Sequence, residues 1–142
     1  MICVVPFRLE HLARLDVQDY QRPDRDRLLE LPQRHVLEDM SSYTIVDGDE
    51  PFICGGVMEM APWRGLAWCY LAKDLGTKMV LAHRVAKRLV DAVPYDRVEF
   101  EIRSEHEEGH RWVQLLGFEL ETACVRKYRY DGGDIARYVR IR

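Results

Sequence analysis

The chain has 142 residues, a length that suits one domain with a core of its own. Its small net charge of −3 argues against nucleic acid or an anionic membrane as a partner, and no apolar run approaches the ~20 residues of a membrane span. The first residues lack the basic start of a secretory signal, so we expect a cytoplasmic protein.

The N-terminal third of the chain indicates one strand followed by short helices. Residues 2–7 resemble a strand, and apolar residues at helical spacing predict a helix over 8–16. The polar stretch 18–27 contains Pro23 and indicates a connector, in which Asp24 or Asp26 caps a helix that continues to Leu31. Pro32 then interrupts or restarts this helix, which we expect to reach Met40.

The next elements form a hairpin. Residues 42–46 and 52–60 have the composition of strands, and Asp47-Gly48 between them is a strong hairpin signal. The pair Gly55-Gly56 inside the second strand predicts a bulge or a close approach of two backbones.

The middle of the chain predicts a buried strand and a long helix. A turn over 62–65 leads into 66–71 (LAWCYL), which has the apolar run of a strand buried on both faces. The loop 73–78 contains one glycine and precedes a helix over 77–93. The apolar stripe of this helix consists of Val80, Leu81, Val85, Leu89, Val90 and Val93.

The last third of the chain predicts three further strands and a helix. Residues 97–103 alternate between apolar and charged, and the helix around 110–116 follows. Two predicted strands, over 122–130 and 135–141, flank a predicted hairpin turn at 131–134. The sequence therefore predicts a single domain over residues 1–142 of mixed α/β (α+β) class. Its central, mainly antiparallel sheet has about seven strands and is flanked by about four helices.

The segment His106-Glu107-Glu108-Gly109-His110 fits the H-E-x-x-H pattern of zinc hydrolases, in which two histidines one helical turn apart bind the metal. Gly109 inside that helix costs about 1 kcal/mol relative to alanine, and no third ligand is evident. Ser104 and Glu107 instead fit a capping box that begins a helix. We expect no metal and keep a zinc hydrolase as a remote alternative.

Two other segments carry a family resemblance. Residues 73–78 (KDLGTK) stand between the buried strand and the long helix, and Gly117-Phe118 end the last helix. The stretch 66–118 resembles the central portion of the GNAT family of acetyl-CoA-dependent N-acetyltransferases, and the order of elements over the whole chain agrees. That family carries a phosphate-binding loop [QR]-x-x-G-x-[GA] at this place, although Lys78 here replaces its second glycine.

The resemblance implies acetyl-CoA as cosubstrate. Backbone N–H groups of Leu75, Gly76, Thr77, Lys78 and Met79 would hold the pyrophosphate at the helix N-terminus, with added charge from Lys73 and Lys78. The pantetheine arm would lie along the backbone of Trp68, Cys69, Tyr70 and Leu71, where the fourth and fifth strands separate.

The resemblance also implies direct acetyl transfer to an amine, which needs a base and an acid. Glu59 is the nearest candidate base, with Glu99 and Glu101 as others, and Tyr70, Tyr128 and His110 are candidate acids or orienting groups. Val113 stands where the family's last helix usually has the tyrosine that protonates the CoA thiolate. This departure concerns the catalytic step and not the fold.

A finer resemblance is to small GNAT-like proteins encoded by bacteriophages, carried by residues 94–99, 109–112, 116–119 and 130–134. It leaves two alternatives open. One is an active N-acetyltransferase with a small-molecule or protein amine as acceptor. The other is a catalytically degenerate virion or assembly protein whose partners are virion components.

The remaining features indicate structural roles. Four scattered cysteines without a C-x-x-C pair predict buried, reduced thiols. The basic residues of the tail, from Arg126 to Arg142, are typical of charges that protect a sheet edge, and the exposed final hairpin could pair across a homodimer. Trp63 is the tryptophan that we expect to be exposed.

Overall fold

A computed structural model describes all residues, 1–142, and contains one seven-stranded sheet of order β1-β2-β3-β4-β5-β7-β6. Only β4 and β5 run parallel; all other neighbours are antiparallel. The strands are β1 Ile2–Pro6, β2 Ser41–Asp47, β3 Glu50–Ala61, β4 Arg64–Leu71, β5 Arg97–Arg103, β6 Glu119–Val125 and β7 Ile135–Ile141. The mixed, mainly antiparallel sheet confirms the predicted fold class.

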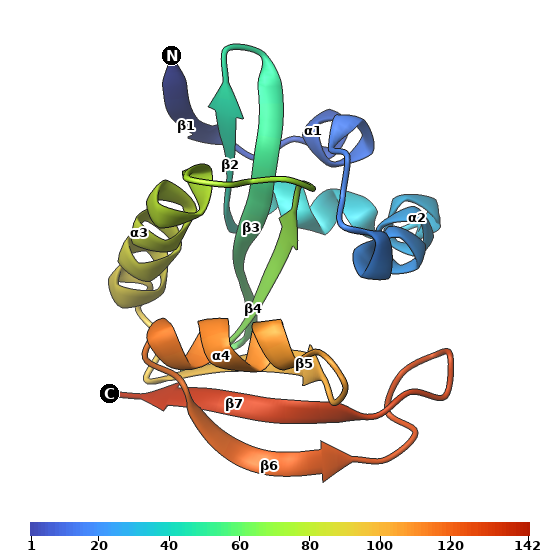
Figure 1. Cartoon of the computed structure of the whole chain (residues 1–142). Helices are drawn as coiled ribbons and strands as arrows, with labels where there is room; N and C mark the ends of the chain where they lie inside the picture. The colour runs from blue at the N-terminus through green and yellow to red at the C-terminus, as the bar shows by residue number, and fades with distance from the viewer.

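Four α-helices cover the two faces of the sheet (Figure 1). They are α1 Leu9–Arg14, α2 Arg22–Glu30, α3 Lys78–Ala92 and α4 Glu107–Leu115, with 3₁₀ turns at η1 Asp19–Gln21 and η2 Arg34–Asp39. Leu12 of α1 and Leu28 of α2 pack with Cys54 of β3, whereas Ala82 of α3 packs with the preceding residue, Ile53. Because successive strand residues face opposite sides, α1 and α2 lie on one face and α3 on the other.

The prediction of a connector over 18–27 is wrong, because helix α2 begins at Arg22. Pro23 lies in the first turn of α2, where a missing N–H group removes no helical hydrogen bond, so the helix begins at Arg22. Neither Asp24 nor Asp26 is its N-cap, which is Gln21. Arg25 is buried and donates hydrogen bonds to the carbonyl oxygens of Leu12 (3.1 Å) and Leu15 (2.8 Å), which fastens α2 to the end of α1.

The β2–β3 hairpin forms where the sequence indicates it. Gly48 has φ +62°, a left-handed conformation that glycine adopts without steric penalty. In β3, a Cβ atom on Gly56 would lie 2.5 Å from the carbonyl oxygen of Ser41 on β2. The glycine pair of β3 is therefore explained by close approach of two backbones.

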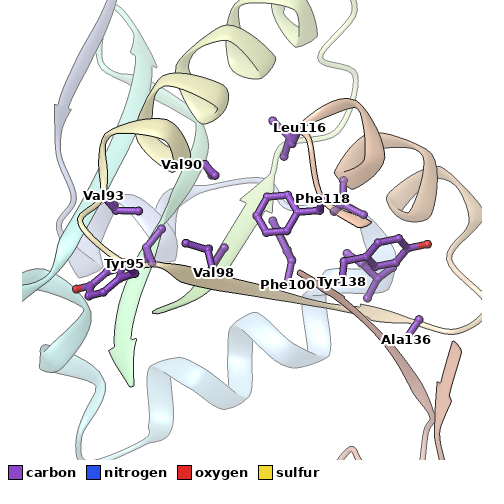
Figure 2. Close-up of a cluster of buried hydrophobic side chains, with 13 residues drawn as sticks. Val90, Val93, Tyr95, Val98, Phe100, Leu116, Phe118, Ala136 and Tyr138 are labelled. Atoms are coloured by element: carbon purple, nitrogen blue, oxygen red, sulfur yellow. The ribbon is translucent and has the colours of Figure 1, made fainter. Parts of the chain in front are cut away.

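The largest apolar cluster joins the second half of the sheet to α3 and α4 (Figure 2). Val98, Phe100 and Ile102 of β5 are buried, as their alternation predicts, and the rings of Phe100 and Phe118 meet edge to face at 5.7 Å. Gly117 (φ +96°) follows α4, and the N–H group of Phe118 donates to the carbonyl oxygen of Val113. Val80, by contrast, is exposed and does not belong to the buried stripe of α3.

The predicted capping box of Ser104 and Glu107 does not form at the start of α4. His106 is the N-cap residue and makes no side-chain cap hydrogen bond, and the buried hydroxyl of Ser104 has no partner. A Cβ atom on Gly109 would lie 2.2 Å from Nδ1 of His106. The glycine is thus needed because the imidazole of His106 packs against the first turn of α4.

The C-terminal region departs from the prediction in one element. Strand β6 ends at Val125, and residues 126–134 form a long loop instead of a short hairpin turn. Lys127 has φ +51°, which breaks the extended conformation of the strand. Cys124 on β6 is exposed and only Cys54 is fully buried, so the prediction of four buried thiols was wrong, although all four are free.

The basic tail forms ion pairs instead of an unpaired charged edge. Arg137 contacts Glu101 (3.1 Å), Arg140 contacts Asp91 (3.1 Å), and Arg129 contacts Asp24. Trp63 is exposed as predicted. None of the helices is both long and apolar enough to span a membrane.

Candidate functional site

The two parallel strands β4 and β5 separate halfway along their length. Their pairing extends from Arg64 opposite Arg97 to Ala67 opposite Phe100, and the rest of β4 has no partner on β5. In Figure 1, β1–β4 and β5–β7 diverge from the point where β4 meets β5. The predicted separation of the strands at Trp68–Leu71 is therefore present.

A cavity of about 820 Å³ occupies this gap and reaches both faces of the sheet. On one face it is lined by side chains of η1, α2 and the 126–134 loop, and on the other by the start of α3 and by α4. The residues 66, 68, 69 and 70 are only half-buried because they border this cavity, which corrects the prediction of a strand buried on both faces.

The loop before α3 has free backbone donors at one end of the cavity. Asp74 and Gly76 both have φ +54°, which bends the chain sharply before the helix. The N–H groups of Leu75, Gly76 and Thr77 make no hydrogen bond within the protein. Such groups at the positive end of a helix form an anion-binding site.

The other two predicted donors in this loop are engaged. The N–H group of Lys78 donates to the carbonyl oxygen of Leu75 (3.0 Å), and that of Met79 donates to Gly76 (3.2 Å). The side chains of the two lysines are also paired: Lys78 contacts Asp47 (3.3 Å) and Lys73 contacts Asp19 (2.8 Å). Because these pairs are exposed and weak, both ammonium groups are held only loosely away from the loop.

The open edge of β4 has a hydrogen-bonding partner that the sequence did not reveal. The side-chain amide of Gln21 donates to the carbonyl oxygen of Cys69 (2.8 Å) and accepts from the N–H group of Leu71 (2.9 Å). The backbone of η1 adds a bond from Gln18 to the carbonyl oxygen of Leu71 (3.0 Å). Part of the edge predicted for pantetheine is therefore already bonded to the protein.

Two ionisable side chains, Tyr70 and His106, border the cavity, and neither the phenol nor the imidazole forms a hydrogen bond with another side chain. Burial raises the pKa of the Tyr70 phenol, so the phenol keeps its proton at neutral pH. Burial also lowers the pKa of His106 below its ordinary 6.5, and the imidazole is neutral at pH 7. The ring of His106 lies against that of Tyr20, with 4.1 Å between the centroids.

An ion-pair network lines the cavity on the α2 side. Oδ1 of Asp24 contacts the guanidinium groups of Arg103 (3.3 Å) and Arg129 and accepts a hydrogen bond from the hydroxyl of Tyr130 (3.2 Å). These contacts join α2 to the end of β5 and to the 126–134 loop. Together with the Tyr20–His106 contact, they make residues 18–24 a bridge between the two separated strands.

Several residues that the sequence suggested for catalysis lie outside the cavity. Glu59 is exposed near the closed end of the β4–β5 pair, where it pairs in register with Gly65 and contacts Tyr95. His110 is turned toward the sheet: Nδ1 lies 2.7 Å from the Tyr138 hydroxyl and Nε2 lies 3.0 Å from the carbonyl oxygen of Ser104. Neither side chain can reach a ligand in the cavity from this position.

Val113 is also absent from the cavity wall. Its side chain is completely buried in the main core, and α4 presents Trp112 to the cavity instead. The indole of Trp112 donates to Nδ1 of His83 on α3 (3.2 Å), which links the two helices across that side. A proton donor for this site must come from another element.

Of the two remaining candidate bases, Glu99 lies in an ion-pair cluster and Glu101 lines the cavity. Glu99 is buried and contacts Arg64, Arg97 and Arg137. Its burial raises the pKa of the carboxyl, but the neighbouring guanidinium groups outweigh this effect and keep the pKa below its ordinary value. Glu101 lines the cavity, where Arg137 binds it.

The residues of the zinc pattern serve other contacts. His106 is the N-cap of α4 and packs on Tyr20, and both ring nitrogens of His110 have protein partners. The structure brings together no group of three or more His, Cys, Asp or Glu residues that could hold a metal ion.

The sequence reasoning missed Gln21, His106 as a cavity residue and the Asp24 network. A single glutamine in a polar stretch carries no local signal, because its partners lie 48 and 50 residues along the chain. Gly109 was the one available signal for His106, since a glycine inside a helix indicates close packing of a neighbour.

Comparison with solved structures shows the same fold over nearly the whole chain. A spermidine N-acetyltransferase SpeG chimera from Vibrio cholerae and hSSAT matches with a TM-score of 0.70 at 13% identity, over 99% of this chain and 95% of that chain. Ard1 from Thermoplasma volcanium gives a TM-score of 0.70 at 13% identity, over 99% and 97%. A Bacillus subtilis acetyltransferase in complex with CoA gives 0.68 at 15% identity, over 99% and 97%.

No family model matches the sequence, and no curated protein does. At such low identity the structural likeness establishes the fold, which is that of the GNAT acetyltransferases.

Proposed function

We propose that the protein binds acetyl-CoA and transfers the acetyl group directly to an amine. The observation that carries this proposal is the set of free N–H groups at Leu75, Gly76 and Thr77, of which the first two residues line one end of a cavity between the separated strands. The fold, shared with acetyltransferases of which one was solved with CoA, supports the same reaction class.

The residues at this end of the cavity fit a pyrophosphate. Three unbonded N–H groups meet the N-terminus of the 15-residue helix α3, whose dipole favours negative charge. A side chain on Gly76 would meet no atom within 4 Å, so the loop is open to solvent. Lys73 and Lys78 can leave their exposed carboxylate partners and add positive charge.

Acetyl-CoA would supply an acetyl thioester, and the chain would position and manage protons. The neutral imidazole of His106, which lies against the ring of Tyr20, would accept the proton that a neutral amine loses when it attacks the thioester. The amine nitrogen forms the new C–N bond as the C–S bond breaks, and the Tyr70 phenol donates its proton to the departing sulfur. Glu59 and His110 take no part in this proposal, because they lie outside the cavity.

Calorimetric titration with acetyl-CoA tests the proposal. We expect saturable binding, followed by product formation when an amine is added. An absence of binding at about 1 mM ligand, which limits any affinity to below ~4 kcal/mol, would sink the cofactor assignment. The acceptor, a small molecule or a protein amine in the cytoplasm, is to be found by screening amines against the loaded protein.

A second proposal is a catalytically degenerate assembly protein of a bacteriophage that retains the fold. Two observations favour it: the core position of Val113, and the hydrogen bonds of Gln21 to the β4 edge. Co-purification with virion components would support this alternative, and robust acetylation of an amine by the purified protein would count against it.

A further inference from the structure

The open edge of β4 presents a short row of peptide groups to the cavity. The N–H group of Ala72 donates to Phe52 on β3, and peptide groups alternate in direction along a strand. Cys69 and Leu71 therefore direct their N–H and C=O groups away from β3, toward the gap left by β5. Any extended ligand that pairs with β4 beyond Ala67 must use these groups.

The side chain of Gln21 uses two of these groups in the same way as an extended chain would. Its amide donates one hydrogen bond to Cys69 and accepts one from Leu71, at 2.8 Å and 2.9 Å. The pantetheine arm of CoA carries secondary amides with the same pairing of one donor and one acceptor. An amide of the ligand and the amide of Gln21 cannot occupy this position at the same time.

We propose that Gln21 competes with the pantetheine arm for the β4 edge and must move its side chain aside before acetyl-CoA binds fully. This inference rests on the proposed function and adds a regulatory element to the same site. In the free protein Gln21 satisfies the β4 edge, and in the loaded protein the ligand satisfies it.

The surrounding contacts allow the side chain to move while its backbone stays. Before Gln21, the bond from Gln18 to Leu71 and the single antiparallel bridge between Val17 and Ala72 hold the chain on β4. After it, Asp24 is held by Arg103 and Arg129. Gln21 makes its two β4 contacts through a flexible side chain, so rotation about its χ angles releases both.

Removal of the competing amide should strengthen binding. In the Gln21→Ala protein we expect acetyl-CoA to bind about tenfold more tightly than in the wild type, because two hydrogen bonds no longer have to be broken. The matched control is Gln33→Ala, at an exposed glutamine whose side chain makes no cap hydrogen bond. Calorimetry of both variants and the wild type measures the difference.

A second ligand locates the effect on the arm. ADP carries a pyrophosphate but no pantetheine, so its affinity should be the same in Gln21→Ala and wild type. A tenfold gain for ADP as well would overturn the inference, because the substitution would then act on the phosphate loop.

Hydrogen exchange at one amide gives an independent readout. The N–H group of Leu71 should exchange faster in free Gln21→Ala than in free wild type, and acetyl-CoA should restore its protection. If the wild type binds acetyl-CoA and Gln21→Ala binds it equally well or more weakly, the inference is overturned and the proposed function stands. Absence of binding to every variant would overturn both.

Discussion

The two ends of the β4–β5 pair differ in how their polar groups are satisfied. At the closed end, from Arg64 to Ala67, the strands are paired and the buried carboxylate of Glu99 has three guanidinium partners. At the open end, the strands part around a cavity, and a single glutamine side chain bonds part of the β4 edge. The paired strands and ion pairs of the closed end have little freedom to rearrange. At the open end, by contrast, the β4 edge can exchange its hydrogen-bonding partner.

This difference indicates which end of the β4–β5 pair contributes to stability and which end is available to a ligand. A fully partnered buried charge resists rearrangement, because removal of one member leaves the others unsatisfied. Free N–H groups and a displaceable amide can be taken over by a ligand at small cost. Perturbations of the closed end should therefore affect stability, and those of the open end should affect binding and turnover.

The largest effect is expected from Glu99→Ala. Removal of this carboxylate leaves Arg64, Arg97 and Arg137 facing one another, and we expect a loss of about 3 kcal/mol in the free energy of unfolding. Urea denaturation measures it. Glu119→Ala, at an exposed acid on β6, should cost less than ~0.5 kcal/mol. Equal losses in the two variants would show that the closed end is not specially stabilised.

The same carboxylate predicts a pH dependence of stability. Because the folded-state pKa of Glu99 lies below its ordinary value, its contribution is complete above that ordinary value and is lost as the pH falls through the folded pKa. The difference in stability between wild type and Glu99→Ala should therefore shrink in acid. A difference that stays constant down to about pH 3 would contradict this assignment.

The next effect concerns the open end. Tyr70→Phe removes the proposed proton donor and should lower kcat about hundredfold while leaving acetyl-CoA affinity nearly unchanged. Steady-state kinetics with calorimetry separate the two quantities. Tyr95→Phe alters a buried phenol near the closed end and should leave kcat unaffected. Full activity of Tyr70→Phe would remove Tyr70 from the reaction.

A smaller effect is expected from Gly76→Val. The positive φ of Gly76 is unfavourable for a β-branched residue, so the loop should shift and acetyl-CoA should bind about tenfold more weakly. Gly48→Val is a matched control, since Gly48 also has a positive φ and open space around it but lies in the β2–β3 turn. Similar weakening in both variants would indicate general destabilisation.

The smallest expected effect is a change of kcat/KM with pH. Burial lowers the pKa of His106, while the nearby charges of Glu108 and Glu105 raise it and those of His110 and Arg103 lower it further. As a base, His106 must be neutral, so kcat/KM should rise with pH through a value below 6.5 and then level off. His106→Gln should abolish this limb, whereas His35→Gln, at an exposed site, should keep it. A limb that persists in His106→Gln would assign it to another group.

Much of the fold was predictable because its signals are local. Alternation over 97–103 indicated β5, the Asp47-Gly48 turn indicated the β2–β3 hairpin, and Gly117 marked the end of α4. The prediction failed where a distant contact decides the local structure: the 126–134 loop leaves the sheet, and Arg129 and Tyr130 contact Asp24 more than 100 residues away. Pro23 misled for another reason, because proline both ends helices and begins them.

The candidate site was predicted in part. The family resemblance implied the separation of β4 from β5, which the structure has, and it implied a phosphate-binding role for the loop before α3, which stays a prediction. Of the three candidate catalytic residues, Tyr70 borders the cavity whereas Glu59 and His110 do not, because a strand pattern gives the face of a side chain but not the end of the sheet at which it lies. Glu59 was chosen as an acid close to β4 in sequence, yet it lies at the closed end.

By itself, the sequence determined the class of fold, the strand order near the hairpin and the position of the loop before α3, since these depend on periodicity, turn residues and helix ends. The tertiary structure alone decided which polar groups share the cavity. Gln21 meets Cys69 and Leu71, and His106 meets Tyr20, only because η1 crosses the gap between two strands. Pairing over such distances depends on the packing of whole elements, and no local pattern of residues encodes it.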